Sequence, residues 1–179
     1  GPLRVLLATR HIPLRDVPGA LNPAGVGEAV ELAAEALPWL GVKDGRIGVA
    51  GLNPHAGDGG AIGDEERTIL EPALRSLSRR VPRVEGPIPA DVIFHRAIRG
   101  DLDAVVALYH DQGLAPLKMI AFDRGVNVTL GLPIVRTSPD HGTAFDIAGR
   151  GIADESSMRA ALRTAAELAG RPNPWAARS

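Results

Sequence analysis

Almost wholly apolar runs alternate with amphipathic stretches along this chain, and the alternation restricts its fold more than any other feature. Strand candidates occupy residues 3–9, 46–52, 103–109 and, with interruptions at Gly131 and Pro133, 126–137. Helix candidates with apolar residues at helical spacing occupy 26–37, 64–80, 90–99 and 156–169. Strands that alternate with helices predict an α/β layered fold with a mixed, mostly parallel sheet, in which ligands bind beyond the carboxyl ends of the strands.

Composition excludes several classes of partner. The formal net charge is -1 with no basic stripe, and aromatic residues make up only 3%, so nucleic acid is not an expected partner. No apolar stretch approaches the roughly 18 residues that a membrane span needs, so no membrane partner is expected. The chain has no cysteine, which excludes disulfides and thiolate metal sites and fits a cytoplasmic location.

Three of the five histidines each follow a strand candidate: His11 after 3–9, His55 after 46–52 and His110 after 103–109. A single histidine after a strand is usually a loop residue bonded to backbone, but three such placements favour a shared site. Imidazole suits zinc and other divalent metals, and three histidines leave a coordination position open for substrate. The pattern therefore predicts a divalent metal site at the strand ends.

The segment 51–66 combines five glycines with the start of the helix candidate at 64–80. Such a loop lets backbone N–H groups approach an anion closely, although it matches neither the dinucleotide nor the P-loop pattern. We expect Asp64 to cap the helix, and Glu65 and Glu66 to complement its positive end. Further along, Lys118, Arg124 and Arg136 are three cations in a mostly apolar segment, each of which is by default a solvated charge.

A family resemblance is carried by five stretches: ATRHIPLRDV, GLNPHAGDGG, GPIPAD, YHDQGLAPLK and DRGVNVTLGLPIVRTSPDHGTAFDIAGRGIAD. Together they resemble the 4-hydroxythreonine-4-phosphate dehydrogenase family of pyridoxal phosphate biosynthesis. The resemblance implies the layered fold of the isocitrate and isopropylmalate dehydrogenases. It also implies a homodimer with a metal site shared across the interface, and the metal ligands carry over to His11, His55 and His110. Zinc is the first expectation for the metal, with magnesium or cobalt as alternatives.

The resemblance also assigns residues to substrate, catalysis and cofactor. The substrate-binding residues that it implies are Lys118, Asn127 and Arg136. Asp91 and Asp111 match acidic residues near the reaction centre, and the choice of general base among Asp91, Asp111 and Lys118 stays open. The stretch 140–154 is similar to the loop that contacts the adenosine side of NAD, which implies that the cofactor is bound by His141, Gly142, Thr143 and Ala144.

The implied reaction is NAD-dependent oxidation, with decarboxylation, of 4-phosphooxy-threonine to 3-amino-2-oxopropyl phosphate. The alternatives are a dehydrogenase of threonate or erythronate 4-phosphate or of a dihydrodiol, an inactive metal-binding dimerisation module, and a metal hydrolase. Family members are about twice as long, and the expected organisation is a site-bearing α/β domain at 1–155. A C-terminal helix and tail at 156–179 would pack on an N-terminal domain that is missing here and would expose Leu162 and Leu168. A chain of this extent is expected to bind metal and dimerise but to turn over poorly.

Overall fold

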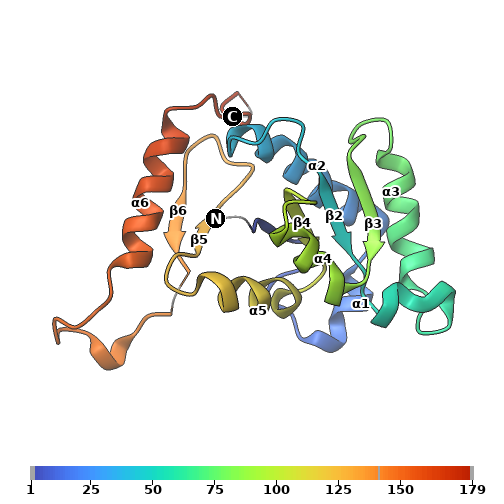
Figure 1. The fold of residues 1–179 in the computed structure, drawn as a ribbon, viewed down its shortest axis with the longest axis horizontal. Coiled ribbons are helices and arrows are strands. Elements are labelled where there is room, and N and C mark those ends of the chain that lie inside the picture. The colour runs from blue at the N-terminus through green and yellow to red at the C-terminus, as the bar shows by residue number, and fades with distance from the viewer. Residues whose placement is uncertain (1–2, 141, 178–179) are drawn as a thin grey trace. The chain divides into compact units, whose positions relative to one another are not determined.

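The computed structural model describes residues 3–140 and 142–177 of the 179-residue chain. Its contacts divide it into two compact units, Gly1–Pro116 and Leu117–Ser179 (Figure 1). The strands are β1 (Val5–Leu7), β2 (Ile47–Ala50), β3 (Val84–Ile88), β4 (Ala104–Ala107), β5 (Val126–Val128) and β6 (Thr137–Pro139). The α-helices are α1 (Val17–Ala20), α2 (Pro23–Trp39), α3 (Glu71–Leu77), α4 (Ala90–Ile98), α5 (His110–Ala121) and α6 (Ser156–Ala169). Shorter helical segments are η1 (Leu14–Asp16), η2 (Pro54–Gly60), η3 (Glu66–Leu70) and η4 (Phe145–Ile147).

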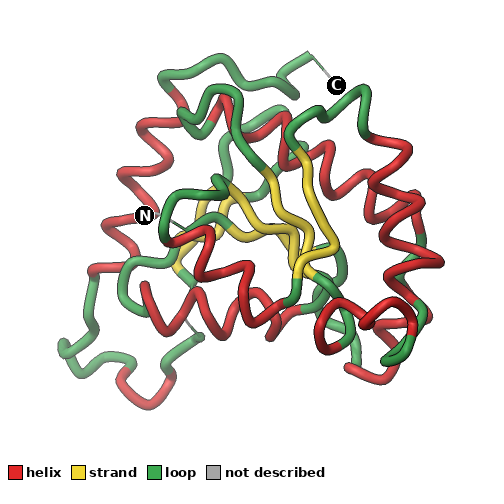
Figure 2. Tube along the Cα trace, turned by 45° about the vertical axis from the view of Figure 1, so that its right-hand side comes forward, coloured by secondary structure: helices red, strands yellow, loops and turns green. Residues whose placement is uncertain are grey.

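The first unit contains a four-stranded sheet in the order β1-β4-β2-β3. All three pairings are parallel. Val105 of β4 lies opposite Val5 of β1 on one side and opposite Gly48 of β2 on the other. Figure 2 shows these strands side by side among the helices that connect them. The expected α/β class and mostly parallel pairing are therefore confirmed, and the parallel arrangement brings the carboxyl ends of β1, β4 and β2 to one edge.

The two faces of this sheet are buried against different helices. Along β4, Ala104 and Val106 belong to the core beneath α2 and α3, whereas Val105 and Ala107 belong to the core beneath α4. Both faces are apolar because side chains alternate across a strand and a parallel sheet is covered on both sides. All four residues of β4 are buried, which explains why this strand stands out in the sequence as an apolar run.

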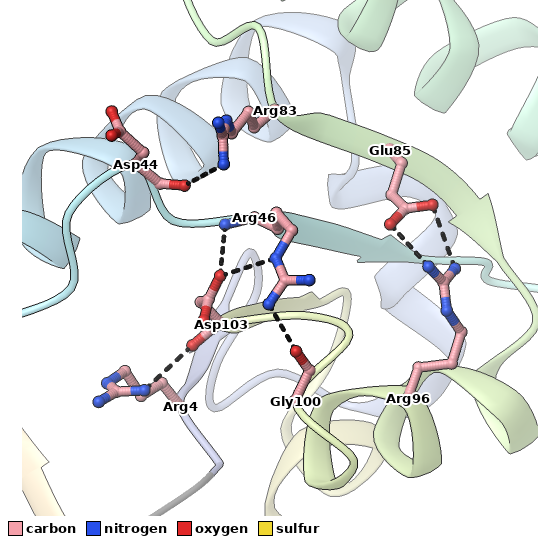
Figure 3. Close-up of polar contacts among 8 residues, drawn as sticks. All are labelled: Arg4, Asp44, Arg46, Arg83, Glu85, Arg96, Gly100 and Asp103. Atoms are coloured by element: carbon pink, nitrogen blue, oxygen red, sulfur yellow. Dashed lines mark hydrogen bonds and ion pairs between the residues drawn. The ribbon is translucent and has the colours of Figure 1, made fainter.

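The amino-terminal edge of the sheet is held by an ion pair between Arg46 and Asp103 (Figure 3). Oδ2 of Asp103 accepts hydrogen bonds from the backbone N–H of Arg46 at 2.8 Å and from its Nε at 3.1 Å. The Arg46 guanidinium also donates to the carbonyl of Gly100. Burial alone raises the pKa of Asp103, but the bonds from Arg46 and the charges of Arg46 and Arg4 outweigh it, so the pKa lies below its ordinary value. This pair joins the starts of β2 and β4.

The second unit pairs β5 with β6 in antiparallel fashion, and α6 packs on this hairpin. Leu168 of α6 is 2% exposed, so the expectation that it is left uncovered is wrong. Leu162 on the same helix is 64% exposed, as expected. Packing of this helix on a further domain stays a prediction.

Two elements of the first unit escape the sequence patterns. The segment after β4, expected to be a loop, begins helix α5 at His110, although Pro116 lies inside this helix. The helix starts directly at the strand end because Gly113 lies against the sheet, where an added Cβ would be 2.7 Å from Val5 Cγ1. The edge strand β3 was hidden by Gly86 and Pro87, which break the usual strand pattern.

Within the described residues, no helix combines the length and the apolar character that crossing a membrane requires.

Candidate active site

The three strand-end histidines follow three neighbouring strands. His11 lies beyond β1, His110 begins α5 directly after β4, and His55 lies in η2 after β2. Strand β4 lies between β1 and β2 in the sheet. His110, which follows β4, therefore has the segment after β1 on one side and the segment after β2 on the other. Backbone pairing continues past β1, since the N–H of Ala8 donates to the carbonyl of Ala107 at 2.8 Å. The structure therefore places all three predicted ligands at one edge of one sheet.

The rings of His11 and His110 face each other across the β1–β4 edge. Their centroids lie 5.3 Å apart with the planes tilted by 43°. Two imidazoles on one tetrahedral zinc, with Zn–N bonds of about 2.0–2.1 Å, would have centroids roughly 5.2 Å apart. Nδ1 of His110 lies 2.6 Å from Oδ1 of Asp111, which leaves Nε2 for another partner. This pair of rings fits two ligands of one divalent ion, with a carboxylate orienting one of them.

His55 lies apart from this pair. In residues 3–140 and 142–177, no three His, Asp or Glu side chains form a group arranged to hold a metal ion. His55 is exposed and adopts a left-handed backbone conformation, with φ of 53° and ψ of 28°. Positive φ continues through Ala56, Gly57, Asp58, Gly59 and Gly60, so six successive residues share this sign of φ. One chain thus brings two of the three predicted ligands together and presents the third on a separate loop.

The glycine-rich loop binds an anion, but the anion is its own Glu66. This side chain is only 4% exposed, and its Oε1 accepts the backbone N–H groups of Leu52 at 2.8 Å and Asn53 at 2.7 Å. Its Oε2 accepts Nδ2 of Asn53 at 2.9 Å. Glu66 lies in the first helical turn, as expected, and it also binds the start of the preceding loop. The sequence signal lies in its spacing, because Glu66 stands four residues before buried Leu70 on the same helical face.

The neighbouring carboxylates have separate roles. Oε2 of Glu65 accepts Nδ2 of Asn53 at 2.8 Å, and this bond is the main cause that lowers the pKa of Glu65. Asp64 does not cap the helix through its side chain. Its Oδ1 instead accepts Nε of Arg67 at 2.8 Å, while its carbonyl accepts the N–H and hydroxyl of Thr68.

Gln112 connects the loops after β4 and β2. Its Oε1 accepts the backbone N–H of Leu108 at 2.7 Å, and its Nε2 donates to the carbonyl of Gly51 at 2.7 Å. The side chain is 8% exposed, so both bonds are shielded from water. Sequence patterns missed Gln112 because it was read as part of a polar loop, whereas it lies in the first turn of a helix that packs on the sheet.

The predicted substrate residues lie in the second unit. Nζ of Lys118, in α5, is 3.8 Å from Oδ2 of Asp140. Asn127 is exposed on β5 opposite Ser138. Arg136 is exposed, and its Nη1 donates to Oγ1 of Thr129 at 2.7 Å. The hairpin therefore presents an amide and a guanidinium to solvent.

The remaining candidates are exposed or undescribed. Asp91 lies exposed in the first turn of α4. Gly142, Thr143 and Ala144 are all exposed, and Ala144 is left-handed with φ of 48°. His141 falls outside the described residues.

Comparison with known proteins gives consistent matches over this chain. The family described as pyridoxal phosphate biosynthetic protein PdxA matches residues 1–165. A 4-hydroxythreonine-4-phosphate dehydrogenase of Roseobacter denitrificans is 52% identical over 170 residues, which are 94% of this chain and 52% of the relative. A D-threonate 4-phosphate dehydrogenase of Cupriavidus necator is 53% identical over 171 residues, covering 94% of this chain and 51% of the relative.

A solved structure agrees with these matches. The 4-hydroxythreonine-4-phosphate dehydrogenase of Klebsiella pneumoniae superposes with a TM-score of 0.83 at 44% identity, covering 92% of this chain and 50% of that one. The present chain thus spans about half the length of the relatives that it matches. The match covers nearly the whole chain, including the three strand ends, β5–β6 and most of α6, and this chain belongs to the PdxA family of pyridoxal phosphate biosynthetic proteins.

Proposed function

We propose that this chain forms part of an NAD- and divalent-metal-dependent dehydrogenase that oxidises a phosphorylated hydroxy acid. The observation that carries the proposal is the pairing of the His11 and His110 rings, 5.3 Å apart, at the carboxyl ends of neighbouring parallel strands. Support comes from the relatives, whose names describe dehydrogenases of 4-phosphorylated compounds. The first candidate substrate is 4-phosphooxy-threonine, with decarboxylation to 3-amino-2-oxopropyl phosphate.

The histidines fit a divalent metal, with zinc as the first candidate and magnesium or cobalt behind it. His11 and His110 would be ligands from one subunit, and His55 would complete the set across a homodimer interface, since a single chain keeps it apart from the other two. When bound, the ion supplies Lewis-acid polarisation of a substrate oxygen. Asp111 holds the His110 ring through Nδ1, which directs Nε2 toward the metal position.

The chain's own residues would bind the substrate and move its proton. Arg136 offers a planar fork to a carboxylate or phosphate, and Lys118 offers a point charge. Asn127, exposed on the same hairpin as Arg136, supplies an amide for hydrogen bonding. The candidates for the general base are Asp91, Asp111 and Lys118, each able to accept a proton from a substrate alcohol when unprotonated.

NAD would be held by the loop that contains Gly142, Thr143 and Ala144, together with His141. The three described residues of this set are exposed. The left-handed Ala144 turns the chain just before η4, which allows several consecutive N–H groups to approach a ligand.

A second substrate is favoured by a specific finding. The Cupriavidus necator relative named for D-threonate 4-phosphate matches this chain as well as the relatives named for 4-hydroxythreonine 4-phosphate do. The two substrates differ in one substituent, because the threonine compound carries an amino group where the threonate compound carries a hydroxyl group. A direct comparison of both compounds in an NADH-forming assay decides between them.

The test of the proposal is binding, measured on the purified chain. Metal content by mass spectrometry and NAD affinity by calorimetry are compared among wild type, His110→Ala and the control His95→Ala. His95 is an exposed histidine of α4, so its removal matches the chemical change without touching the strand ends. We expect wild type and the control to bind metal and NAD, and His110→Ala to lose the metal.

Other outcomes separate the alternatives. Metal binding without NAD would favour a metal-binding dimerisation module. Absence of metal from a wild-type chain offered zinc, cobalt and magnesium would overturn the metal site.

A further inference from the structure

We propose that Glu66 is a positioning residue that shapes the His55 loop, here defined as residues 53–60. The inference rests on the proposed function in one respect, which is that His55 binds the metal. Hydrogen bonds and packing within the first unit fix the position of Glu66, and they do not depend on the metal. No part of the proposed reaction uses this carboxylate directly.

The His55 loop has a backbone conformation that its own residues do not favour. His55, Ala56 and Asp58 have φ values of 53°, 52° and 44°, in the left-handed region that side chains with a Cβ rarely adopt. A run of such residues persists only where its surroundings impose it. Backbone hydrogen bonds close both ends of the loop, from the N–H of Ala56 to the carbonyl of Asn53 at 3.1 Å and from the N–H of Ala61 to the carbonyl of Asp58 at 3.2 Å.

The Glu66 carboxylate constrains the loop from outside it. It receives two backbone N–H groups at the loop entrance, from Leu52 and Asn53, and the side-chain amide of Asn53. Three donors around one buried carboxylate satisfy its charge and fix the direction in which the chain leaves β2. Among the described residues, no buried side-chain nitrogen or oxygen lacks a hydrogen-bond partner, so this network is complete.

Three glycines in and beside the loop pack closely on their neighbours. A Cβ on Gly57 would lie 2.7 Å from Oε2 of Glu66, and one on Gly63 would lie 2.3 Å from Nδ2 of Asn53. A Cβ on Gly51 would meet the backbone of Ala56 at 2.9 Å. Close packing on Glu66, Asn53 and Ala56 therefore requires glycine at these three positions. The loop is wrapped around an internal carboxylate, and His55 stands on its outer side as an exposed residue.

Replacing Glu66 by glutamine tests the role with a small change. The amide oxygen of Glu66→Gln can still accept the N–H groups of Leu52 and Asn53, so the variant keeps the bonds needed to fold. Its amide nitrogen, however, would be a donor facing the donor Nδ2 of Asn53. Glu66→Ala removes all three bonds and serves as the more severe variant.

The matched control is Glu71→Gln, which makes the same chemical change on α3. The Glu71 side chain is 45% exposed and pairs with Arg75 at 3.1 Å, away from the loop. Urea midpoints of all variants establish the conditions under which each is folded. Two readouts are then taken on folded protein: amide hydrogen exchange of peptides covering 51–62, and Co²⁺ affinity with its visible absorption spectrum.

We expect Glu66→Gln to keep its bonds to Leu52 and Asn53 but to lose protection in the rest of the loop, because the Asn53 side chain is displaced, while peptides of β2 and β4 exchange as in wild type. Its Co²⁺ affinity should fall about 10–100-fold, the usual effect of removing a group that orients a ligand. Glu66→Ala should weaken binding further, and Glu71→Gln should match wild type. A role in stability alone would shift the urea midpoint without changing the affinity of the folded chain or its spectrum.

The remaining outcomes overturn the inference in distinguishable ways. Co²⁺ affinity of Glu66→Gln within about twofold of the control, or unchanged exchange in 51–62, would overturn the positioning role and leave the metal site intact. Failure of wild type to bind Co²⁺ would overturn the metal site and, with it, the purpose assigned to the loop.

Discussion

The side-chain amide of Gln112 donates a 2.7 Å hydrogen bond to the carbonyl of Gly51, and so joins the helix after β4 to the loop after β2. The same side chain accepts the N–H of Leu108 at the end of β4. Two strand ends that carry candidate metal ligands are thus tied to each other by one buried residue. The bridge adds to the direct pairing of β2 with β4.

Replacing Gln112 by alanine should destabilise the first unit. The change leaves a buried N–H and a buried carbonyl without their partner, and each unsatisfied group costs about 1–3 kcal/mol. Urea unfolding followed by circular dichroism should show the loss, with the exposed Glu28→Ala of α2 as a control that stays within about 0.5 kcal/mol of wild type. Equal midpoints for the two variants would contradict the bridge.

Two glycine-to-alanine changes should have opposite signs. At Gly113 an added Cβ would lie 2.7 Å from Val5 Cγ1 and 2.8 Å from Leu7 Cδ2, so overpacking should cost about 1–3 kcal/mol. At Gly27, inside α2, a Cβ meets nothing within 4 Å, so alanine should stabilise the helix by about 0.5–1 kcal/mol. Thermal unfolding of both variants provides the comparison, and destabilisation by Gly27→Ala would show that the space around it is not open.

The ion pair at the amino-terminal edge predicts a pH dependence of stability. The pKa of Asp103 lies below its ordinary value of 3.8, because the contributions of Arg46 and Arg4 exceed that of burial. The unfolded chain therefore binds a proton at higher pH than the folded chain does, so the stabilisation is present above about pH 4 and is lost as pH falls through the folded pKa.

Asp103→Asn removes this dependence and should cost about 1–2 kcal/mol at pH 7, with little cost below pH 3. Urea midpoints measured from pH 2.5 to 7 give the test. The exposed Asp101→Asn serves as control. A cost for Asp103→Asn that does not shrink in acid would mean that the charge is not the stabilising element.

The C-terminal helix offers a matched pair of leucines. Leu168→Ala should destabilise the second unit by about 2–5 kcal/mol, because its side chain is only 2% exposed and a cavity would remain. Leu162→Ala, on the exposed side of the same helix, should change stability by less than about 0.5 kcal/mol. Hydrogen exchange of the α6 amides reports the difference, and similar effects of both changes would show that Leu162 is covered in solution.

Asp111 and Asp91 can be separated by metal affinity. Asp111→Asn weakens the carboxylate contact with Nδ1 of His110 and should lower the Zn²⁺ affinity about tenfold. This is the lower end of the usual effect of losing a group that orients a metal ligand, because Asp111 is 86% exposed and water screens its charge. Asp91→Asn, in the first turn of α4, should leave the affinity unchanged. Calorimetric titration with Zn²⁺ distinguishes them, and an equal loss for both would assign Asp91 a place beside the metal.

Local periodicity identified most of the elements. The apolar run 103–109 became the fully buried β4, and the helix expected at 156–169 matches α6 at both ends. These elements can be predicted from the sequence, because a strand that is buried on both faces is apolar throughout and a helix that is buried on one side has apolar residues at helical spacing. Helix α5 escaped detection, because its packing depends on Gly113 meeting Val5 and Leu7, which are distant in the chain.

The α/β class and the placement of a histidine after each of three strands could be predicted from the amino-acid sequence alone. Which strands are neighbours was decided only by the tertiary structure, because pairing order depends on the crossover connections and not on any local pattern. The order β1-β4-β2 brings His11 and His110 into contact, whereas the left-handed segment after β2 carries His55 on a separate loop. The buried position of Glu66 also depends on the tertiary structure. Only the folded chain brings the N–H groups of Leu52 and Asn53 to this carboxylate, which the sequence places at a helix end.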